Sequence, residues 1–130
     1  HRTKTTNRYF NYIYVRMGAH TLIHKRTEDD IWKNLFELPL VETEKDLSEE
    51  EFLACPQFHA LFAEGEVRMV RTLLRGVKHV LSHRVIYTNF YEVTLPDNSS
   101  SFSSYQRVAV EDLGRYAVPR LIHAFLEKYV

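Results

Sequence analysis

The chain has 130 residues, of which 45% are hydrophobic, and its 17 Lys and Arg residues balance 17 Asp and Glu residues. This length suits one domain with a buried core, and the hydrophobic share argues against intrinsic disorder. No run of about 18 apolar residues is present, so no transmembrane helix is predicted. Cys55 is the only cysteine, which excludes an internal disulfide, and we interpret it as a small hydrophobic residue ahead of a helix rather than a nucleophile.

The first elements are expected to be strands. Residues 8–16 alternate between two sets of mostly apolar side chains, which predicts a strand. A turn at 17–20 and a second β-rich run at 21–26 follow. The order strand, short turn, strand predicts that the two strands pair as a β-hairpin.

The middle of the chain is expected to contain short helices. Residues 27–46 have mixed periodicity and are interpreted as loop with a short strand near 35–38. Ser48 followed by Glu51 is a capping-box pattern, which predicts that a helix begins there. Pro56 suits the first turn of a second short helix.

The second half returns to strands and ends in a helix. Residues 68–74 and 78–82 are expected to be extended, and 85–95 has the clearest period-two alternation in the chain. Pro119 is expected in the first turn of a final helix. The sequence therefore predicts one α+β domain, with a mixed or antiparallel sheet packed between helices and no internal repeat. The apolar stripe of the final helix comprises Leu121, Ile122, Phe125, Leu126 and Tyr129.

The charges are unevenly distributed although their sum is zero. Residues 1–27 hold six Lys or Arg and no acid, residues 28–66 hold 12 acids, and residues 67–91 hold five Lys or Arg and no acid. If the two basic segments share one face of the fold, they form an anion-binding surface.

The histidines do not predict a metal site. Two pairs have a four-residue spacing, His20 with His24 and His79 with His83. That spacing brings two imidazoles together on a helix, but both pairs fall on predicted strands or turns. No third ligand completes a tetrahedral site. Ser82 beside His83 is not a catalytic pair either, because neighbouring residues of a strand point to opposite faces.

Hydrogen-bond donors cluster at the predicted turn between the strands 78–82 and 85–95. Leu81 is the apolar residue of this turn. An apolar side chain flanked by donors suits a protein that enters a DNA base step and holds the phosphate backbone. An ordinary solvated turn with a basic flank has the same spacing, so both interpretations stay open. The candidate DNA-contacting residues are Lys78, His79, Leu81, Ser82, His83 and Arg84.

Three stretches together resemble the C-terminal domain of MutY-type adenine DNA glycosylases. The first is "RYFNYIYVRMGAHTLIHKR" with "DIWKNLFELP", the second is "VKHVLSHRVIYTNFYEV", and the third is "YQRVAVEDLGRYAVPRLIHAFLEKY". The resemblance covers nearly the whole chain. It implies a Nudix-like α+β fold over 8–130, with 1–7 as the remnant of an interdomain linker.

The resemblance also implies a function without catalysis in this chain. In that family the C-terminal domain helps to recognise 8-oxoguanine mispaired with adenine, while a separate N-terminal helical domain with an iron–sulfur cluster excises the adenine. We therefore expect no catalytic residue, metal or cofactor here. The implied partners are duplex DNA with 8-oxoguanine opposite adenine and the protein's own N-terminal catalytic domain. A monomer without membrane contact, in the bacterial cytoplasm at the nucleoid, is expected by the same resemblance.

Residue roles follow from the matching positions. Leu81 takes the place of an apolar wedge, where relatives commonly have Phe, Ser82 is expected to hydrogen-bond the oxidised edge of the lesion, and His83 to support the loop or backbone. Oxidation converts the guanine N7 from an acceptor to an N–H donor, and a hydroxyl can accept from it. The phosphate contacts expected with lower weight are Lys78, His79 and Arg84.

Two other functions are weighed against this one. Hydrolysis by a Nudix fold needs a helix of glutamates that holds a divalent metal, in the pattern G-x5-E-x7-R-E-U-x-E-E-x-G-U, where U is aliphatic. With the pattern placed after Pro39, its acidic and basic positions fall on side chains that cannot do this chemistry. A protein-interaction module that docks through the acidic segment 28–66 is the other alternative. The residues at the Glu and Arg positions of the pattern are Leu47, Cys55, Pro56, His59 and Ala60.

Overall fold

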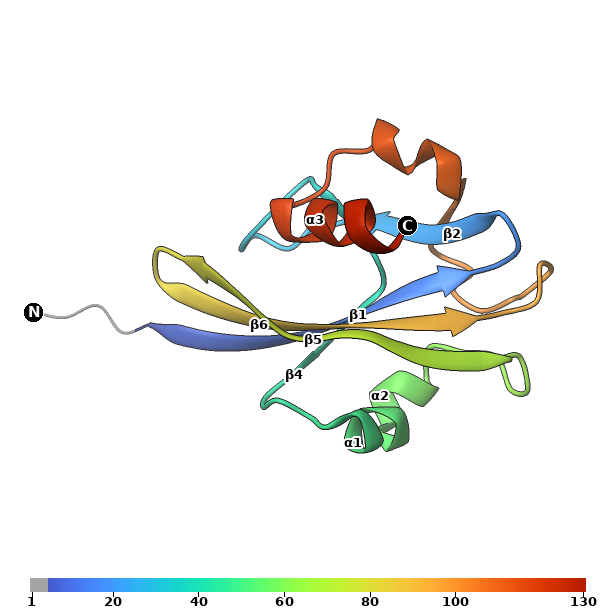
Figure 1. Ribbon diagram of the computed structural model, residues 1–130, viewed down its shortest axis with the longest axis horizontal. Helices are drawn as coiled ribbons and strands as arrows, with labels where there is room; N and C mark the ends of the chain where they lie inside the picture. The colour runs from blue at the N-terminus through green and yellow to red at the C-terminus, as the bar shows by residue number, and fades with distance from the viewer. Residues whose placement is uncertain (1–4) are drawn as a thin grey trace, which may run out of the picture.

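The structure is a computed structural model that describes residues 5–130. Two β-sheets and a few helices form the fold (Figure 1). The elements in chain order are β1 (Thr6–Arg16), β2 (His20–Lys25), β3 (Phe36–Glu37), β4 (Leu40–Thr43), α1 (Glu49–Ala54), α2 (Pro56–His59), β5 (Met69–Leu81), β6 (Arg84–Thr94), β7 (Gln106–Ala109), the 3-10 helix η1 (Val110–Arg115) and α3 (Arg120–Tyr129).

The larger sheet has the strand order β4-β1-β6-β5, and the smaller has the order β3-β2-β7. The pair β1–β6 is parallel, whereas β1–β4 and β5–β6 are antiparallel. In Figure 1, α1 and α2 lie below the larger sheet, while α3 and β2 lie above it. The architecture confirms the predicted α+β class with a mixed sheet.

Both faces of the larger sheet carry core residues, which explains its aromatic strands. Successive side chains of a strand point to opposite faces. On the upper face, the ring of Phe90 stacks on Phe125 of α3, with centroids 4.1 Å apart. On the lower face, Tyr91 stacks on Phe52 of α1, with centroids 4.6 Å apart. Aromatic side chains of this size bury a large apolar area each, so these contacts join the helices to the sheet.

The predicted hairpin over 8–26 is wrong in its pairing. β1 and β2 share only one isolated bridge, between Met17 and His20, and then diverge into different sheets. β1 is instead hydrogen-bonded to β4 on one side and to β6 on the other. Both edges of β1 are therefore occupied by strands that are distant in sequence. β1 also begins at Thr6, two residues before the expected start of the domain.

The helix signals are confirmed. The hydroxyl of Ser48 accepts from the backbone N–H of Glu51, and the Glu51 carboxylate accepts from the backbone N–H of Ser48, which completes the capping box of α1. Pro56 opens α2. Pro119 lies at the N-cap of α3, one position before the predicted first turn. Three elements were not predicted, namely β4, β7 and η1.

A buried ionic network fixes the segment between β2 and β3. The Tyr12 hydroxyl donates to Glu37 over 2.7 Å, and the Arg26 guanidinium donates to both Glu37 carboxylate oxygens over 3.1 Å. Arg26 also donates to Asp30, which accepts from Arg8 as well. Burial, together with the Glu37 charge, raises the pKa of Tyr12 well above its ordinary value. The network holds the loop that carries Trp32 against the sheet.

No helix within residues 5–130 has the length and apolar character needed to cross a membrane.

Candidate nucleic-acid interface at the β5–β6 turn

The predicted turn is a two-residue β-hairpin connection. Leu81 ends β5 and pairs with Arg84 at the start of β6, so that Ser82 and His83 form the turn, and both are exposed. The backbone N–H of Thr6 donates to the His83 carbonyl over 3.0 Å, which fixes the beginning of β1 beside the turn. Figure 1 shows this end of the hairpin extending beyond α3 on one side of the sheet and beyond α1 and α2 on the other. The turn is therefore open to a large partner.

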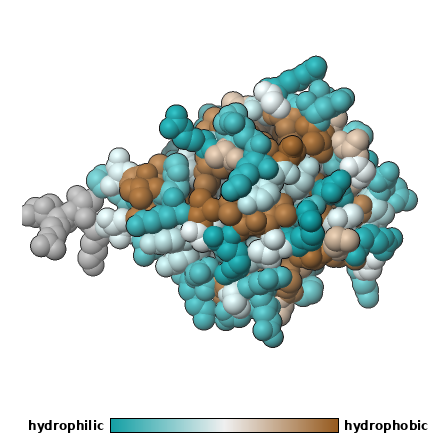
Figure 2. All heavy atoms as spheres, in the orientation of Figure 1, coloured by the Kyte–Doolittle hydropathy of each residue, from teal (hydrophilic) through white to brown (hydrophobic). Residues whose placement is uncertain are grey.

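Leu81 does not form an exposed apolar tip, in contrast to the sequence-based expectation. Its side chain is half-buried and packs against the upper core, because Leu81 shares the upper face with Val77 and Ile86. The exposed apolar residue of the hairpin is Val80, with 66% of its surface accessible. Figure 2 shows hydrophobic surface at the end of the molecule where the turn lies. The sequence places an apolar residue at the turn, but which one is exposed depends on the face of the sheet that the core covers.

The candidate phosphate contacts lie on two faces of the hairpin. His79 and Arg84 share the upper face with Leu81, whereas Lys78 is on the lower face, because it alternates with His79 along β5. The ring of His79 is half-buried, 5.9 Å from the ring of Trp32. Trp32 itself is half-buried and packs against the upper core. His79 therefore has a structural contact in addition to its candidate role.

The wider anion-binding surface expected from the charge distribution is not confirmed. Five arginines of the two basic segments pair with acids instead. Among residues 5–130, Lys78 and Arg84 have no ion pair. Part of the acidic segment folds back onto the basic ones, and the basic residues of these two segments that form no ion pair within residues 5–130 are Lys25, Arg68, Lys78 and Arg84, of which the last two flank the β5–β6 turn. The paired arginines are Arg8 (with Asp30 and Glu42), Arg16 (Glu92), Arg26 (Asp30 and Glu37), Arg71 (Glu92) and Arg75 (Asp46).

The part of the chain that the structure describes contains no cluster of side chains suited to bind a divalent metal ion. No group of three or more His, Cys, Asp or Glu side chains within residues 5–130 is arranged to hold a metal ion. The exposed acids Glu49, Glu50 and Glu51 lie in the first turn of α1, where they favour the helix dipole. The helical region breaks at Cys55 and Pro56, between α1 and α2. A glutamate-lined helix that binds Mg²⁺ is therefore not formed here.

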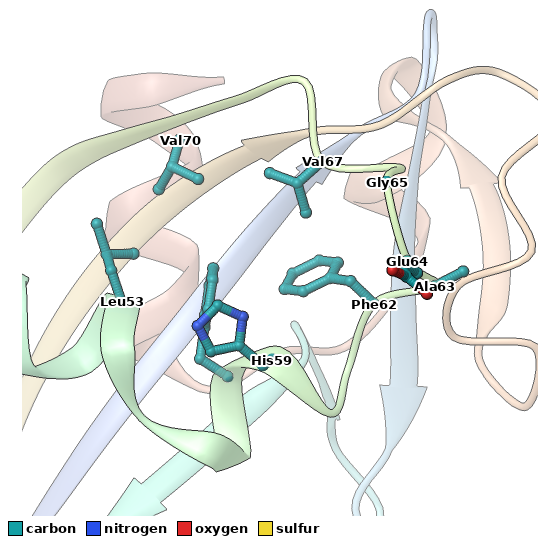
Figure 3. A pocket seen from close by; sticks show the side chains of 9 residues that line it. Leu53, His59, Phe62, Ala63, Glu64, Gly65, Val67 and Val70 are labelled. Carbon is teal, nitrogen blue, oxygen red and sulfur yellow. The ribbon is translucent and has the colours of Figure 1, made fainter.

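A pocket of about 560 Å³ lies between α1, α2 and the beginning of β5 (Figure 3). Figure 3 shows Leu53, Phe62, Val67 and Val70 around it, with the His59 ring at its edge. The lining is mostly apolar, and its titratable groups, His59 and Glu64, have no nucleophile beside them. The one cysteine, Cys55, is half-buried beside this lower core.

Comparison with known proteins identifies the family. A family model described as a NUDIX domain matches residues 11–128. The chain therefore belongs to the NUDIX domain family. No curated protein matches the chain.

Solved structures agree in fold. The complex between the C-terminal domain of mouse MUTYH and human PCNA contains a chain with a TM-score of 0.67 and 14% identity, over 94% of this chain and 86% of that one. The MutT protein from Methanosarcina mazei Go1 has a TM-score of 0.60 and 18% identity, over 95% of this chain and 93% of that one. A MutT structure from a study of Aliivibrio salmonicida and Vibrio cholerae has a TM-score of 0.61 and 16% identity, over 95% of this chain and 96% of that one. At these identities the likeness concerns the fold alone.

Proposed function

We propose that this NUDIX domain is a DNA lesion-recognition domain of an adenine DNA glycosylase, which reads 8-oxoguanine opposite adenine through the β5–β6 turn. Ser82 and His83 contact the lesion, and Leu81 supports the turn and supplies apolar contact to the base step. His79, Arg84 and Lys78 contact phosphates. The observation that carries the proposal is the exposed Ser82–His83 turn, which extends beyond the helices and has unpaired basic residues next to it.

Two further observations support this function. The glutamate positions of the Nudix pattern are occupied by Leu47, Pro56 and His59, which supply no carboxylate, and this favours binding over hydrolysis. The C-terminal domain of mouse MUTYH has the same fold. Excision of adenine then belongs to a separate domain with an iron–sulfur cluster. Such a cluster needs several cysteine ligands, and this chain has only Cys55.

The chemistry of the turn suits the oxidised base. Unmodified guanine presents an acceptor at N7, whereas 8-oxoguanine presents an N–H donor there. The Ser82 hydroxyl can accept that hydrogen bond. One such bond contributes roughly 0.5–1.5 kcal/mol, which corresponds to about two- to tenfold in affinity. Further discrimination has to come from the shape of the mispair and from the catalytic domain.

Fluorescence anisotropy tests the proposal with two labelled duplexes, one with 8-oxoguanine opposite adenine and one with guanine opposite adenine, at low salt. We expect the wild-type chain to bind the oxidised duplex more tightly. Ser82→Ala is expected to remove about two- to tenfold of that preference. Ser104→Ala, at an exposed serine of another loop, is the matched control and should keep the preference. Failure of the wild-type chain to bind either duplex would contradict the proposal and favour the protein-interaction role.

A further inference from the structure

The helices α1 and α2 cover only part of the lower face of the larger sheet (Figure 1). α1 and α2 pack over the part of this face that contains Ile13, Tyr91 and Val93. Among residues 5–130, no helix lies below the sheet toward the β5–β6 turn (Figure 1). We call this uncovered part the open sheet face. Its residues are Asn7, Tyr9, Lys78, Val80, Val85 and Tyr87.

Two tyrosines form the centre of the open sheet face. Tyr9 and Tyr87 are register partners in the parallel pair β1–β6, and their rings stack with centroids 5.6 Å apart and an interplanar angle of 16°. Both residues are half-buried. Neither phenol hydroxyl has a hydrogen-bond partner within residues 5–130. The pair therefore presents two adjacent hydroxyl groups that are free to donate.

The surroundings of the tyrosines add positive charge and apolar surface. Lys78 is the register partner of Tyr87 across β5–β6, is exposed and forms no ion pair among the described residues. Val80 and Val85 are register partners one step closer to the turn, and Val80 is 66% exposed. Asp46, at the boundary with α1, accepts from Asn89 over 3.3 Å and lies 3.8 Å from Arg75, so its charge is already compensated.

We propose that the open sheet face is a second DNA-contact surface, which holds the sugar–phosphate backbone of the duplex beside the lesion. The inference rests on the proposed function of the turn and extends it to β1. Phosphate oxygens accept hydrogen bonds from Lys, Tyr and Asn side chains, and these contacts position a protein without reading sequence. Lys78, the two tyrosine hydroxyls and the exposed Asn7 amide are donors of these types.

The position of this surface supports a continuous interface. Val80 immediately precedes Leu81 in β5, and Val85 immediately follows Arg84 in β6, so the open sheet face begins where the turn ends. Apolar valine side chains suit contact with deoxyribose, whereas the donors further along suit phosphates. The two surfaces then have different tasks, because Ser82 and His83 of the turn contact the lesion, whereas the open sheet face contacts only the backbone.

The test measures affinity for the oxidised and the unmodified duplex over a series of salt concentrations. The double variant Tyr9→Phe/Tyr87→Phe removes only the hydroxyls and keeps the stacked rings, and Lys78→Gln removes only the charge. Matched controls are Tyr116→Phe, whose hydroxyl accepts from Gln106, and Lys128→Gln on α3.

We expect both test variants to weaken binding to the two duplexes by the same factor, about two- to tenfold. Lys78→Gln should also lower the dependence of log affinity on log salt concentration by about one. The controls should behave as wild type.

The outcomes separate the two proposals. Unchanged affinity in both test variants, with Ser82→Ala still reducing the lesion preference, overturns the second surface and the phosphate contact of Lys78, and leaves lesion recognition by the turn standing. Such a result would favour a protein that docks on the open sheet face. Loss of the lesion preference without loss of affinity for the unmodified duplex also overturns the inference, because backbone contacts carry no lesion information. Failure of the wild-type chain to bind either duplex overturns both proposals.

Discussion

Val80 and Leu81 are neighbours in β5, yet they point to opposite faces of the sheet: Val80 is 66% exposed, whereas Leu81 packs against the upper core. Because of this alternation, substitution of Leu81 should affect the stability of the fold more than substitution of Val80. Leu81→Ala removes buried methyl groups and should lower the free energy of unfolding by about 1–2 kcal/mol, less than for a fully buried leucine. Val80→Ala should change it by at most about 0.5 kcal/mol.

Urea denaturation of the two variants checks this prediction. Equal stability of Leu81→Ala and wild type would mean that Leu81 is free of the core, as an isolated wedge residue would be. A binding defect in Leu81→Ala has to be corrected for its lost stability before it is assigned to DNA contact.

The second prediction concerns Glu37, which is almost fully buried and accepts hydrogen bonds from Tyr12 and Arg26. Glu37→Ala leaves the buried Arg26 guanidinium without this partner. Removing one partner of a buried pair costs about 3–5 kcal/mol, and we expect the lower end of this range because Arg26 keeps its ion pair with Asp30. Chemical denaturation measures the loss, and the exposed Glu111→Ala serves as control with a change within about 0.5 kcal/mol. A change in Glu37→Ala that is as small as that in Glu111→Ala would show that the network does not stabilise the fold.

The third prediction is a pH dependence that arises at Glu66. Hydrogen bonds from Ser99 and Ser101 lower the pKa of Glu66 from an ordinary 4.5 to about 2. A carboxyl whose pKa is lower in the folded state stabilises that state at pH values above the unfolded pKa, and the stabilisation is lost as the pH falls through the folded pKa. Glu66→Ala should therefore be less stable than wild type at pH 7, and the difference should shrink between pH 4.5 and 2.

Thermal unfolding across a pH series measures this difference. Glu64→Ala is the control, because Glu64 is exposed two positions earlier. A difference between Glu66→Ala and wild type that stays constant down to pH 2 would contradict the carboxylate's role.

The fourth prediction separates binding from hydrolysis. With Mg²⁺ and a nucleoside triphosphate, phosphate release by the chain is expected to stay at the rate of the buffer alone, because Leu47, Pro56 and His59 supply no carboxylate oxygen to the metal. A colorimetric phosphate assay measures this rate. Mg²⁺-dependent release that is lost in Glu50→Gln would contradict the prediction, since it would place the metal on the exposed acids of α1.

The elements with strong local signals could be predicted from the sequence. The period-two alternation of β6 and the capping box formed by Ser48 and Glu51 depend on residues close in the chain, so they are visible in the sequence. The β5–β6 turn could be predicted for the same reason, because its residues are also close in the chain. The pairing of β1 could not be predicted, because its partners β4 and β6 lie far away in sequence and an alternating strand pairs equally well with many others.

The sequence likewise predicts some residues of the candidate site and misses others. The sequence identifies the turn residues Ser82 and His83, but it gives no sign that Leu81 faces the core, because burial depends on the placement of α3 and the upper sheet. The stacked pair of Tyr9 and Tyr87 could not be found either, since their contact exists only in the parallel register of β1 with β6. An alternation of aromatic residues along both strands was the available signal, and it is equally typical of a buried core.

The most direct test of lesion recognition is an NMR titration of the chain with the 8-oxoguanine·adenine and guanine·adenine duplexes at low salt. If the turn recognises the lesion, the amide signals of Ser82 and His83 shift with both duplexes and shift further with the oxidised one. Equal shifts with the two duplexes, or shifts that leave the turn unaffected, would contradict lesion recognition by the turn.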